Sequence, residues 1–304
     1  MTDSRSRFQV FTDDEWARVE PLLPSNVGRR GHPFGDNRRV VEGIVYRYRT
    51  GIPWRDLPPQ YGPWQTVWKR HRRYAADGTW DRVLARIIAE SDAVEGVDWR
   101  VSVDATITRA HQHATNTTRP RSRTQGAGSN YKNLPFDECE PAGHGIGRSR
   151  GGLTSKIHHA VDGKGRPLAI VVTGGQRNDG AMLSEVLAEI RVPRLGAGRP
   201  RTRPDMLLAD RAYSTGVIRA ELRRRAITAV IPLKRDQIAN RKRRGSAGGR
   251  PAAFDAEAYT NRNVVERSFN KIKQWRALAT RYDKLAITYR AAATIFAILT
   301  WLRA

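Results

Sequence analysis

The fold of this chain is decided by residues 97–111, VDWRVSVDATITRAH. Here Val101 and Val103 alternate with Ser102 and Asp104, and this period of two residues predicts a β-strand with Asp104 on the face opposite the valines. The preceding sequence has apolar residues at helical spacing instead. The change of period near residue 97 predicts a helical domain over residues 1–95 and an α/β domain over residues 96–304.

The helical part contains a basic and aromatic segment that suits DNA binding. Helices are predicted over residues 13–23, 36–51, 64–78 and 79–91, with Pro- and Gly-rich connections between them. The third helix interleaves Trp64, Trp68 and Tyr74 with four cations, Lys69, Arg70, Arg72 and Arg73. A short helix of this kind after a tight turn, basic and aromatic together, is typical of the second helix of a helix-turn-helix. The alternative is an ordinary basic helix whose aromatic residues pack in the core of their own domain.

The second part of the chain predicts a mixed sheet. Strand 97–111 is followed by a hairpin with Asp162-Gly163 at its turn, and then helices alternate with strands ending near Asp210 and Leu233. The order β-β-β-α-β-α-β-α gives an antiparallel start and later strands that must run parallel. Residues 111–150 and 234–252 are basic and lack periodicity, so they are predicted to be mobile loops.

Three carboxylates stand where such a sheet could bring them together. Asp104 lies on the first strand, Asp210 at the carboxyl end of the fourth, and Glu266 in the segment 255–275, DAEAYTNRNVVERSFNKIKQW. That segment predicts one amphipathic helix, with Glu266 on its polar face and Val265 and Ile272 on the opposite face. An unpartnered Asp in a strand is costly to bury, so chelation of a divalent metal is the simplest explanation.

Composition points to a polyanionic partner. The 304 residues carry a net charge of +24, with a pI of about 11.1, and only nine of the 54 basic residues are lysines. Such a surplus is expected of a nucleic-acid-binding protein. The single cysteine, Cys139, excludes a disulfide framework and a Cys-rich zinc site and favours a reducing cytoplasm. We expect no signal peptide and no membrane span, and we expect the apolar C-terminal run to be a buried helix.

The segment around Glu266 matches a known pattern. Tyr259, Arg262, Glu266 and Lys273 fit Y-x2-R-x3-E-x6-K at every position. This pattern, with VDATITRAH, GGLTSKIHHAVD and LLADRAYS, resembles the IS4/IS5-type insertion-sequence transposases, the IS5 family in particular. The resemblance covers nearly the whole chain. Many IS4-type relatives carry a β-rich insertion before the glutamate helix, where this chain has only residues 234–252.

The resemblance implies an RNase H-like catalytic domain, with a mixed five-stranded sheet and flanking helices, whose DDE triad is Asp104, Asp210 and Glu266. The triad would hold two Mg²⁺ ions, or Mn²⁺ in their place, for hydrolysis at the element ends and transfer of the 3′-OH into target DNA. The implied partners are double-stranded DNA, at the terminal inverted repeats and at the target, and a second copy of the chain in a homodimer. The implied location is the prokaryotic cytoplasm, at the nucleoid.

Further residues are candidates for DNA contact. Arg262 and Lys273 would hold phosphates beside the metals, with Tyr259 on the same stripe. The sequence also offers, besides the cations of helix 64–78, Lys156, His158, Arg148 and Arg150. For these last four, an ordinary solvated surface is the alternative reading.

Three other functions remain to be distinguished. An RNase H-like nuclease or resolvase would share the carboxylates without strand transfer. A DNA-binding regulator derived from a transposase would lack catalysis, and would tolerate loss of any carboxylate. A zinc site built from His111, His113, Cys139 and His144 would need paired short spacings, which this irregular stretch lacks.

Overall fold

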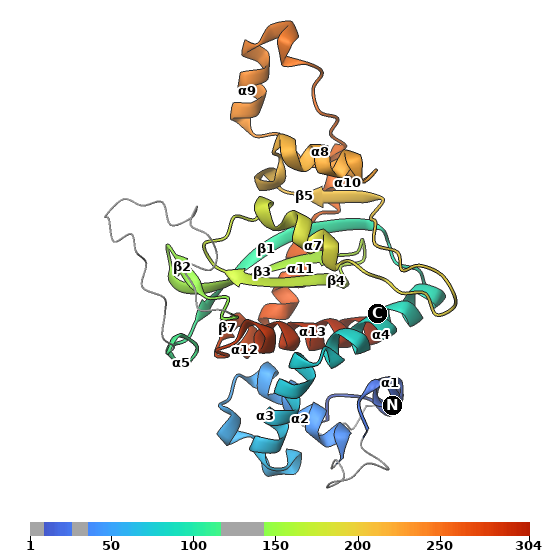
Figure 1. Ribbon diagram of the computed structural model, residues 1–304, viewed down its shortest axis with the longest axis vertical. Coiled ribbons are helices and arrows are strands. Elements are labelled where there is room, and N and C mark those ends of the chain that lie inside the picture. The colour runs from blue at the N-terminus through green and yellow to red at the C-terminus, as the bar shows by residue number, and fades with distance from the viewer. Residues whose placement is uncertain (1–8, 26–35, 117–142) are drawn as a thin grey trace.

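A computed structural model gives the fold and describes residues 9–25, 36–116 and 143–304 (Figure 1). The N-terminal region is helical, as predicted. Its helices are α1 (Asp13–Val19), α2 (Asn37–Thr50), α3 (Trp64–Ala76) and α4 (Thr79–Val94). The later helices are α5 (Gln112–Thr115), α7 (Leu183–Glu189), α8 (Gly216–Arg224), α9 (Arg235–Arg243), α10 (Ala256–Thr260), α11 (Asn263–Lys273), α12 (Arg276–Ala279) and α13 (Ala286–Leu302).

The sheet is mixed, and β1 lies near its centre. Its strands are β1 (Arg100–Ala110), β2 (Gly147–Ser149), β3 (Gly152–Val161), β4 (Pro167–Gly174), β5 (Met206–Ala209), β6 (Thr228–Val230) and β7 (Thr280–Arg281). On one side β1 pairs antiparallel with β3, which pairs antiparallel with β4; on the other, β5 and β6 run parallel to β1. This is the expected mixed arrangement of five strands, to which β2 and β7 add short extensions.

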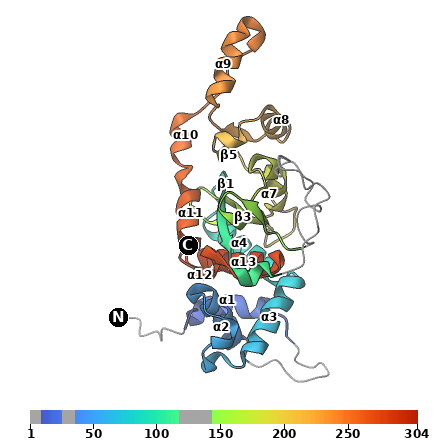
Figure 2. The same ribbon diagram turned by 90° about the vertical axis from the view of Figure 1, so that its left-hand side faces the viewer.

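Helices cover both faces of the sheet. Figure 2 shows α10 and α11 on one side and α7 and α8 on the other. The apolar stripe of α11, including Val265, Phe269 and Ile272, is buried, and Phe269 lies against His159 of β3 with ring centroids 5.5 Å apart. Because the stripe is on one side, the side chain of Glu266 is held on the other, where it is exposed.

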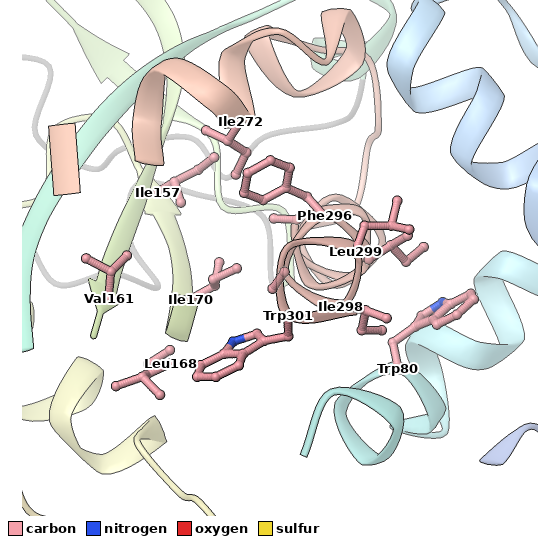
Figure 3. Packing of buried hydrophobic residues seen from close by; sticks show 14 of the residues in the cluster. Trp80, Ile157, Val161, Leu168, Ile170, Ile272, Phe296, Ile298, Leu299 and Trp301 are labelled. Atoms are coloured by element: carbon pink, nitrogen blue, oxygen red, sulfur yellow. The ribbon is translucent and has the colours of Figure 1, made fainter. Parts of the chain in front are cut away.

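The core is continuous between the helical region and the sheet. The helix α13 lies between them, with Phe296 and Trp301 packed toward the sheet and Ile298 and Leu299 near Trp80 of α4 (Figure 3). The C-terminal apolar run is thus a buried helix, as expected. Within the described part of the chain, no helix combines the length and hydropathy needed to cross a membrane.

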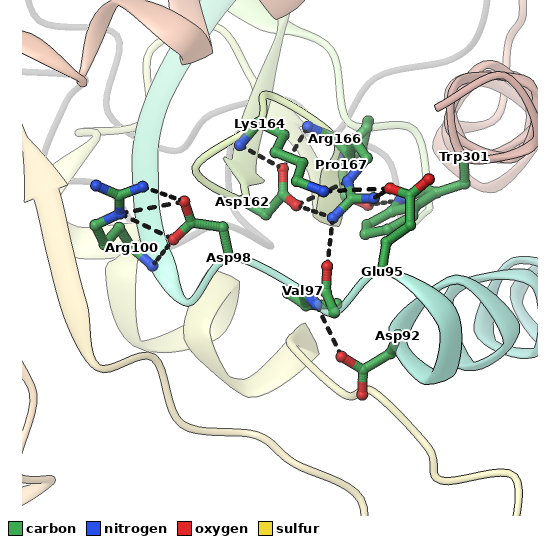
Figure 4. Close-up of polar contacts among 11 residues, drawn as sticks. Asp92, Glu95, Val97, Asp98, Arg100, Asp162, Lys164, Arg166, Pro167 and Trp301 are labelled. Carbon is green, nitrogen blue, oxygen red and sulfur yellow. Dashed lines mark hydrogen bonds and ion pairs between the residues drawn. The ribbon is translucent and has the colours of Figure 1, made fainter.

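A buried ion pair closes the hairpin at the end of β1 remote from residue 110. Arg166, which is 3% exposed, donates to the carboxylate of fully buried Asp162 and to the carbonyl of Gly96 (Figure 4). Its guanidinium also lies 4.0 Å from the ring centroid of Trp301. Loss of one partner of such a buried pair typically costs about 3–5 kcal/mol. The pair therefore fixes the predicted Asp162-Gly163 turn against α4 and α13.

Four local expectations differ from the structure. The segment 111–150, expected to be a mobile loop, contains α5 and β2 where it is described, and its residues 117–142 lie outside the described residues. The predicted helix over 255–275 is broken at Asn261 and Arg262 into α10 and α11. The segment 234–252, expected to be a loop, contains α9, which projects from the body of the molecule (Figures 1 and 2). No α9 residue is buried, so there was no apolar period to reveal it. Finally, α3 follows α2 after a connection with two 3-10 turns, not a tight turn.

Candidate active site

The sheet brings the predicted aspartates to neighbouring strands. Asp104 lies within β1, and Asp210 directly follows β5, the strand parallel to β1. The Asp210 carboxylate accepts a hydrogen bond from the Ala212 backbone at 2.8 Å, which orders the turn after β5. Glu266 stands in the first turn of α11, the helix packed on β1 and β3.

Arg262 joins two members of the triad. Its Nη2 donates to Oδ2 of Asp104 at 2.8 Å, and its Nη1 donates to Oε1 of Glu266 at 2.7 Å. One guanidinium group therefore separates the two carboxylates. The Arg262 and Asp104 side chains are 16% and 19% exposed, whereas that of Glu266 is 52% exposed. The break between α10 and α11 places Arg262 at the N-cap of α11, from which it reaches β1.

The environment of Asp104 is strongly acidic. Burial raises the pKa of the Asp104 carboxyl, and the charges of Asp210 and Asp179 raise it further, against the Ala105 N–H and Arg262, which lower it. Burial also raises the pKa of Tyr213, and the charges of Asp179, Asp104 and Asp210 add to this effect. Four acidic or phenolic groups thus share one region, where a cation would relieve their repulsion.

The residues of this region fit a divalent metal. Carboxylate oxygens are the ligands that Mg²⁺ prefers, and Asp104 and Glu266 already share one cation, the Arg262 guanidinium. Across residues 9–25, 36–116 and 143–304, no three His, Cys, Asp or Glu side chains stand ready to hold a metal. The guanidinium occupies the place between two of the candidate ligands, so a metal there would have to replace it.

A basic cleft of about 680 Å³ opens beside the acidic region. It lies between β1, the start of β3 and the loop after β4, and Asp179 is the acidic residue among those lining it. Its cations are Arg109, Arg150, Lys156 and Arg177, and its polar groups include Gln176 and Asn178. Ile107, half exposed, adds an apolar wall. The cleft thus brings four cations together beside Asp179.

Two family models match this chain. One, described as a putative transposase of the IS4/5 family, matches residues 11–84. The other, described as a transposase DDE domain, matches residues 95–301, well over half of the chain. The chain belongs to the DDE transposase family.

Named relatives agree with this assignment. The transposase is 33% identical over 132 residues to the putative transposase for insertion sequence element IS402 of Burkholderia cepacia, covering 43% of this chain and 55% of that protein. It is 27% identical over 151 residues to the putative transposase for IS6501 of Brucella ovis, covering 50% and 100%. A structure of a pre-cleavage Mos1 transpososome aligns over 97% of this chain and 86% of that chain at 12% identity, with a TM-score of 0.26.

The structure separates the predicted DNA contacts into exposed and buried residues. Lys273, Arg148 and Arg150 are exposed on the transposase, and Tyr259 is half-buried against Phe254. Lys156 is only 8% exposed and bonds within the protein. His158 is fully buried, donates to or accepts from Thr173 Oγ1 at 2.9 Å, and has its pKa lowered to about 3 by burial. The expectation that His158 contacts DNA is therefore wrong in this structure.

In α3 the predicted DNA contacts also divide. Lys69, Arg72 and Arg73 are exposed, whereas Arg70 is 8% exposed and donates to Asn37 Oδ1 at 2.6 Å. Arg70 therefore ties α3 to α2, and its assignment to DNA contact is corrected. The helical period shows which residues share a face with Tyr74, and Arg70, one turn earlier, is among them.

The alternative zinc site is not assembled in the described part of the transposase. The rings of His111 and His113 lie 4.7 Å apart, but His144 is buried and bonds to the carbonyl of Ala114 at 2.8 Å. Cys139 lies outside the described residues. No metal-holding group of three His, Cys, Asp or Glu is found among the residues that are described.

The sequence did not single out Asp179 or Tyr213, and it did not predict that Lys156 bonds to Asp179. Asp179 follows β4 in the segment GGQRND, and Tyr213 lies three residues after Asp210 in LADRAYS. The short spacing between Asp210 and Tyr213 is the signal in the sequence that could have identified Tyr213. Asp179 gave no periodic or motif signal, because its place depends on how the loop after β4 folds back.

Proposed function

We propose that this transposase performs metal-dependent hydrolysis at the ends of its element and then transfers the freed 3′-OH into target DNA, using Asp104, Asp210 and Glu266. The observation that carries the proposal is the cation shared by Asp104 and Glu266, supplied by Arg262 in this structure. Divalent ions, most simply two Mg²⁺ with Mn²⁺ able to substitute, would activate the attacking oxygen and stabilise the leaving oxygen.

The chain's own residues would bind and orient the phosphodiester. With the triad carboxylates neutralised by a metal, the Arg262 guanidinium is free to bind a phosphate, which it can do with two parallel hydrogen bonds. Lys273, exposed further along α11, would hold a second phosphate on the same face, with Tyr259 flanking. The basic cleft, including Arg150 and Arg177, would receive the strand leading to Asp104.

Recognition of double-stranded element ends is assigned to residues 1–95, with the exposed face of α3 as the candidate for base contact. The α/β region, residues 96–304, would supply the catalytic domain and much of the non-specific affinity, to which exposed Arg148 would contribute. We further infer a homodimer on DNA, and a cytoplasmic location at the nucleoid, where the substrate is.

Isosteric removal of each carboxylate tests the proposal. In the full chain, Asp104→Asn, Asp210→Asn and Glu266→Gln should each abolish cleavage of a labelled element end in Mg²⁺. Binding of the same DNA, measured without metal by fluorescence anisotropy, should stay within a factor of about three, since the triad binds cations and its loss reduces repulsion of phosphate.

The matched control is Asp205→Asn. It removes the same charge at the opposite end of β5, where Asp205 is exposed and paired with Arg201. This variant should cleave normally. Cleavage by Asp210→Asn at the wild-type rate would overturn the assignment, and cleavage by the wild type without joining would favour a simple nuclease.

A further inference from the structure

Lys156 clamps the loop after β4 to β3 through two hydrogen bonds. It extends from β3, is 8% exposed, and its Nζ donates to the Arg177 carbonyl at 2.6 Å and to Oδ1 of Asp179 at 2.8 Å. A nearly buried ammonium with both a carbonyl and a carboxylate as acceptors is well compensated. The two bonds fix the loop after β4 at the positions of residues 177 and 179.

The clamped loop packs against the segment that carries Asp210. A Cβ on Gly180 would meet the carbonyl oxygen of Ala212 at 3.0 Å, so the two backbones approach closely here. Ala212 is the residue whose backbone N–H binds the Asp210 carboxylate. A shift of the clamped loop would therefore press on the turn that orients Asp210.

Asp179 stands where the clamped loop meets the turn after β5. It immediately precedes Gly180, the residue whose backbone approaches the Ala212 carbonyl. In that turn the Tyr213 side chain is 1% exposed, and its hydroxyl has no hydrogen-bond partner among the described residues. A buried hydroxyl without a partner, three residues after Asp210, calls for an oxygen-bearing or cationic neighbour at this position.

We propose that Lys156 and Asp179 are a positioning pair of the catalytic centre: Lys156 holds Asp179 where its loop meets the turn that carries Asp210, and the fixed carboxylate strengthens cation binding by the proposed triad. This inference rests on the proposed function of the triad. Lys156 is then not a direct DNA contact, because its ammonium is committed to the loop. The pair acts through the triad and does not touch the reacting phosphate.

Metal affinity measures this role separately from turnover. We would titrate the full chain, without DNA, with Mn²⁺ and record free Mn²⁺ by electron paramagnetic resonance. Asp179→Asn, which keeps the shape, should weaken binding by about 10-fold, as loss of an outer partner of metal ligands commonly does. Lys156→Met should weaken it similarly, Lys156→Arg should restore part of the loss, and Asp205→Asn should bind as the wild type does.

The pair predicts non-additivity. If Lys156 acts through Asp179, the double variant should bind Mn²⁺ no more weakly than the weaker single variant, whereas independent roles would give effects that multiply. Multiplying effects, or wild-type affinity in Asp179→Asn, would overturn the proposal. If Asp210→Asn lost Mn²⁺ binding while Asp179→Asn kept it, only the role of the pair would be contradicted and the proposed function would stand. If both variants kept Mn²⁺ binding, the proposed function would be contradicted as well.

A merely structural role is distinguished by thermal unfolding without metal. Asp179→Asn should keep its Tm close to that of the wild type, since an amide can still accept from Lys156. If Asp179→Asn lost Mn²⁺ affinity only together with a large fall in Tm, and Tyr213→Phe kept full affinity, the pair would be a folding element and the proposal would fail.

Discussion

At the scale of single residues, Arg262 bridges two of the proposed metal ligands. In the structure its guanidinium binds both Asp104 and Glu266, each through one nitrogen. It therefore supplies the positive charge that the acidic region requires in the absence of metal. If the proposed triad holds a divalent ion, the ion and this guanidinium would compete for the same carboxylate oxygens, and metal binding would be linked to the release of Arg262.

Replacement of Arg262 tests this competition. Arg262→Gln should lower the Tm of the metal-free transposase, because Asp104 would lose its principal counter-charge near Asp210 and Asp179. Mn²⁺ should then raise the Tm of the variant by more than it raises that of the wild type, while cleavage falls because residue 262 can no longer bind a phosphate as a cation. Differential scanning fluorimetry with and without Mn²⁺ measures both Tm shifts.

The control for this variant is Arg201→Gln, which removes a cation from the exposed pair with Asp205. Its response to Mn²⁺ should equal that of the wild type. An equal Mn²⁺-induced shift in Arg262→Gln and the wild type would show that the guanidinium does not compete with metal.

At the scale of elements, burial decides which cations of a basic helix are available. The helix α3 presents Lys69, Arg72 and Arg73 to solvent and turns Arg70 toward Asn37 and Tyr74. The charge run alone did not make this distinction. Only the exposed three can contact DNA without rearrangement of the helical region.

We expect the exposed face of α3 to carry preference for element ends. Combined substitution of Lys69, Arg72 and Arg73 by Gln should reduce the affinity ratio between end DNA and unrelated DNA of equal length. If all three cations contact phosphates, the slope of log affinity against log salt should also fall by about three. Anisotropy titrations at several salt concentrations measure both quantities.

A variant with matched charge loss separates specificity from general attraction. Replacing Arg191, Arg223 and Arg224 by Gln removes three exposed cations elsewhere. It should lower affinity for both DNAs without changing their ratio. If the α3 variant also kept its ratio, end recognition would have to lie in another element.

At the scale of the whole molecule, the helical region and the sheet share one core. The helix α13 packs against α4, α3 and β4, and Trp80 and Trp301 are both nearly fully buried in the same cluster. Deleting residues 1–95 would expose one side of this apolar helix, at a cost of about 25 cal/mol for each Å² of apolar surface. Deleting residues 1–95 would therefore be a poor test of DNA recognition, and substitutions on α3 are a better one.

The chain carries one proposed triad, whereas an element has two ends. A closed dimer with two-fold symmetry is the simplest way to hold both ends. We expect a complex of two chains with two end duplexes, in which the projecting helix α9 of each chain, basic at Arg241, Lys242 and Arg243, reaches DNA bound by the other. Mass photometry of the complex formed with Glu266→Gln, which cannot cleave, measures its composition.

The contribution of α9 has its own control. Substituting Arg241, Lys242 and Arg243 by Gln should reduce the two-chain complex but leave binding of one chain to one end within a factor of about three, because these cations would bind phosphates of the second duplex and not of the first. The homodimer would be contradicted if the Glu266→Gln protein, with α9 intact, formed a complex of one chain with a pair of ends.

The sequence alone determined what depends on local periodicity and on spacing. The period of two around Asp104, the apolar run before Asp210 and the apolar stripe of α11 predicted which element carries each carboxylate. The rule that crossover strands run parallel predicted the direction of β5, and the structure shows that β5 is a neighbour of β1. The basic surplus and the Y-x2-R-x3-E-x6-K pattern indicated the class of substrate and the family.

Only the tertiary structure decided what depends on contacts between distant segments. The bridge from Arg262 to Asp104 spans 158 residues, and the bond from Lys156 to Asp179 joins a strand to a loop that has no period. The sequence made Arg70 and His158 candidates for DNA contact at the surface, but packing buries both side chains. The helix α9 was not predicted because it has no buried apolar face. Local pattern fixes which residues share a face, but burial and counter-charge are set by whatever the rest of the chain places against that face.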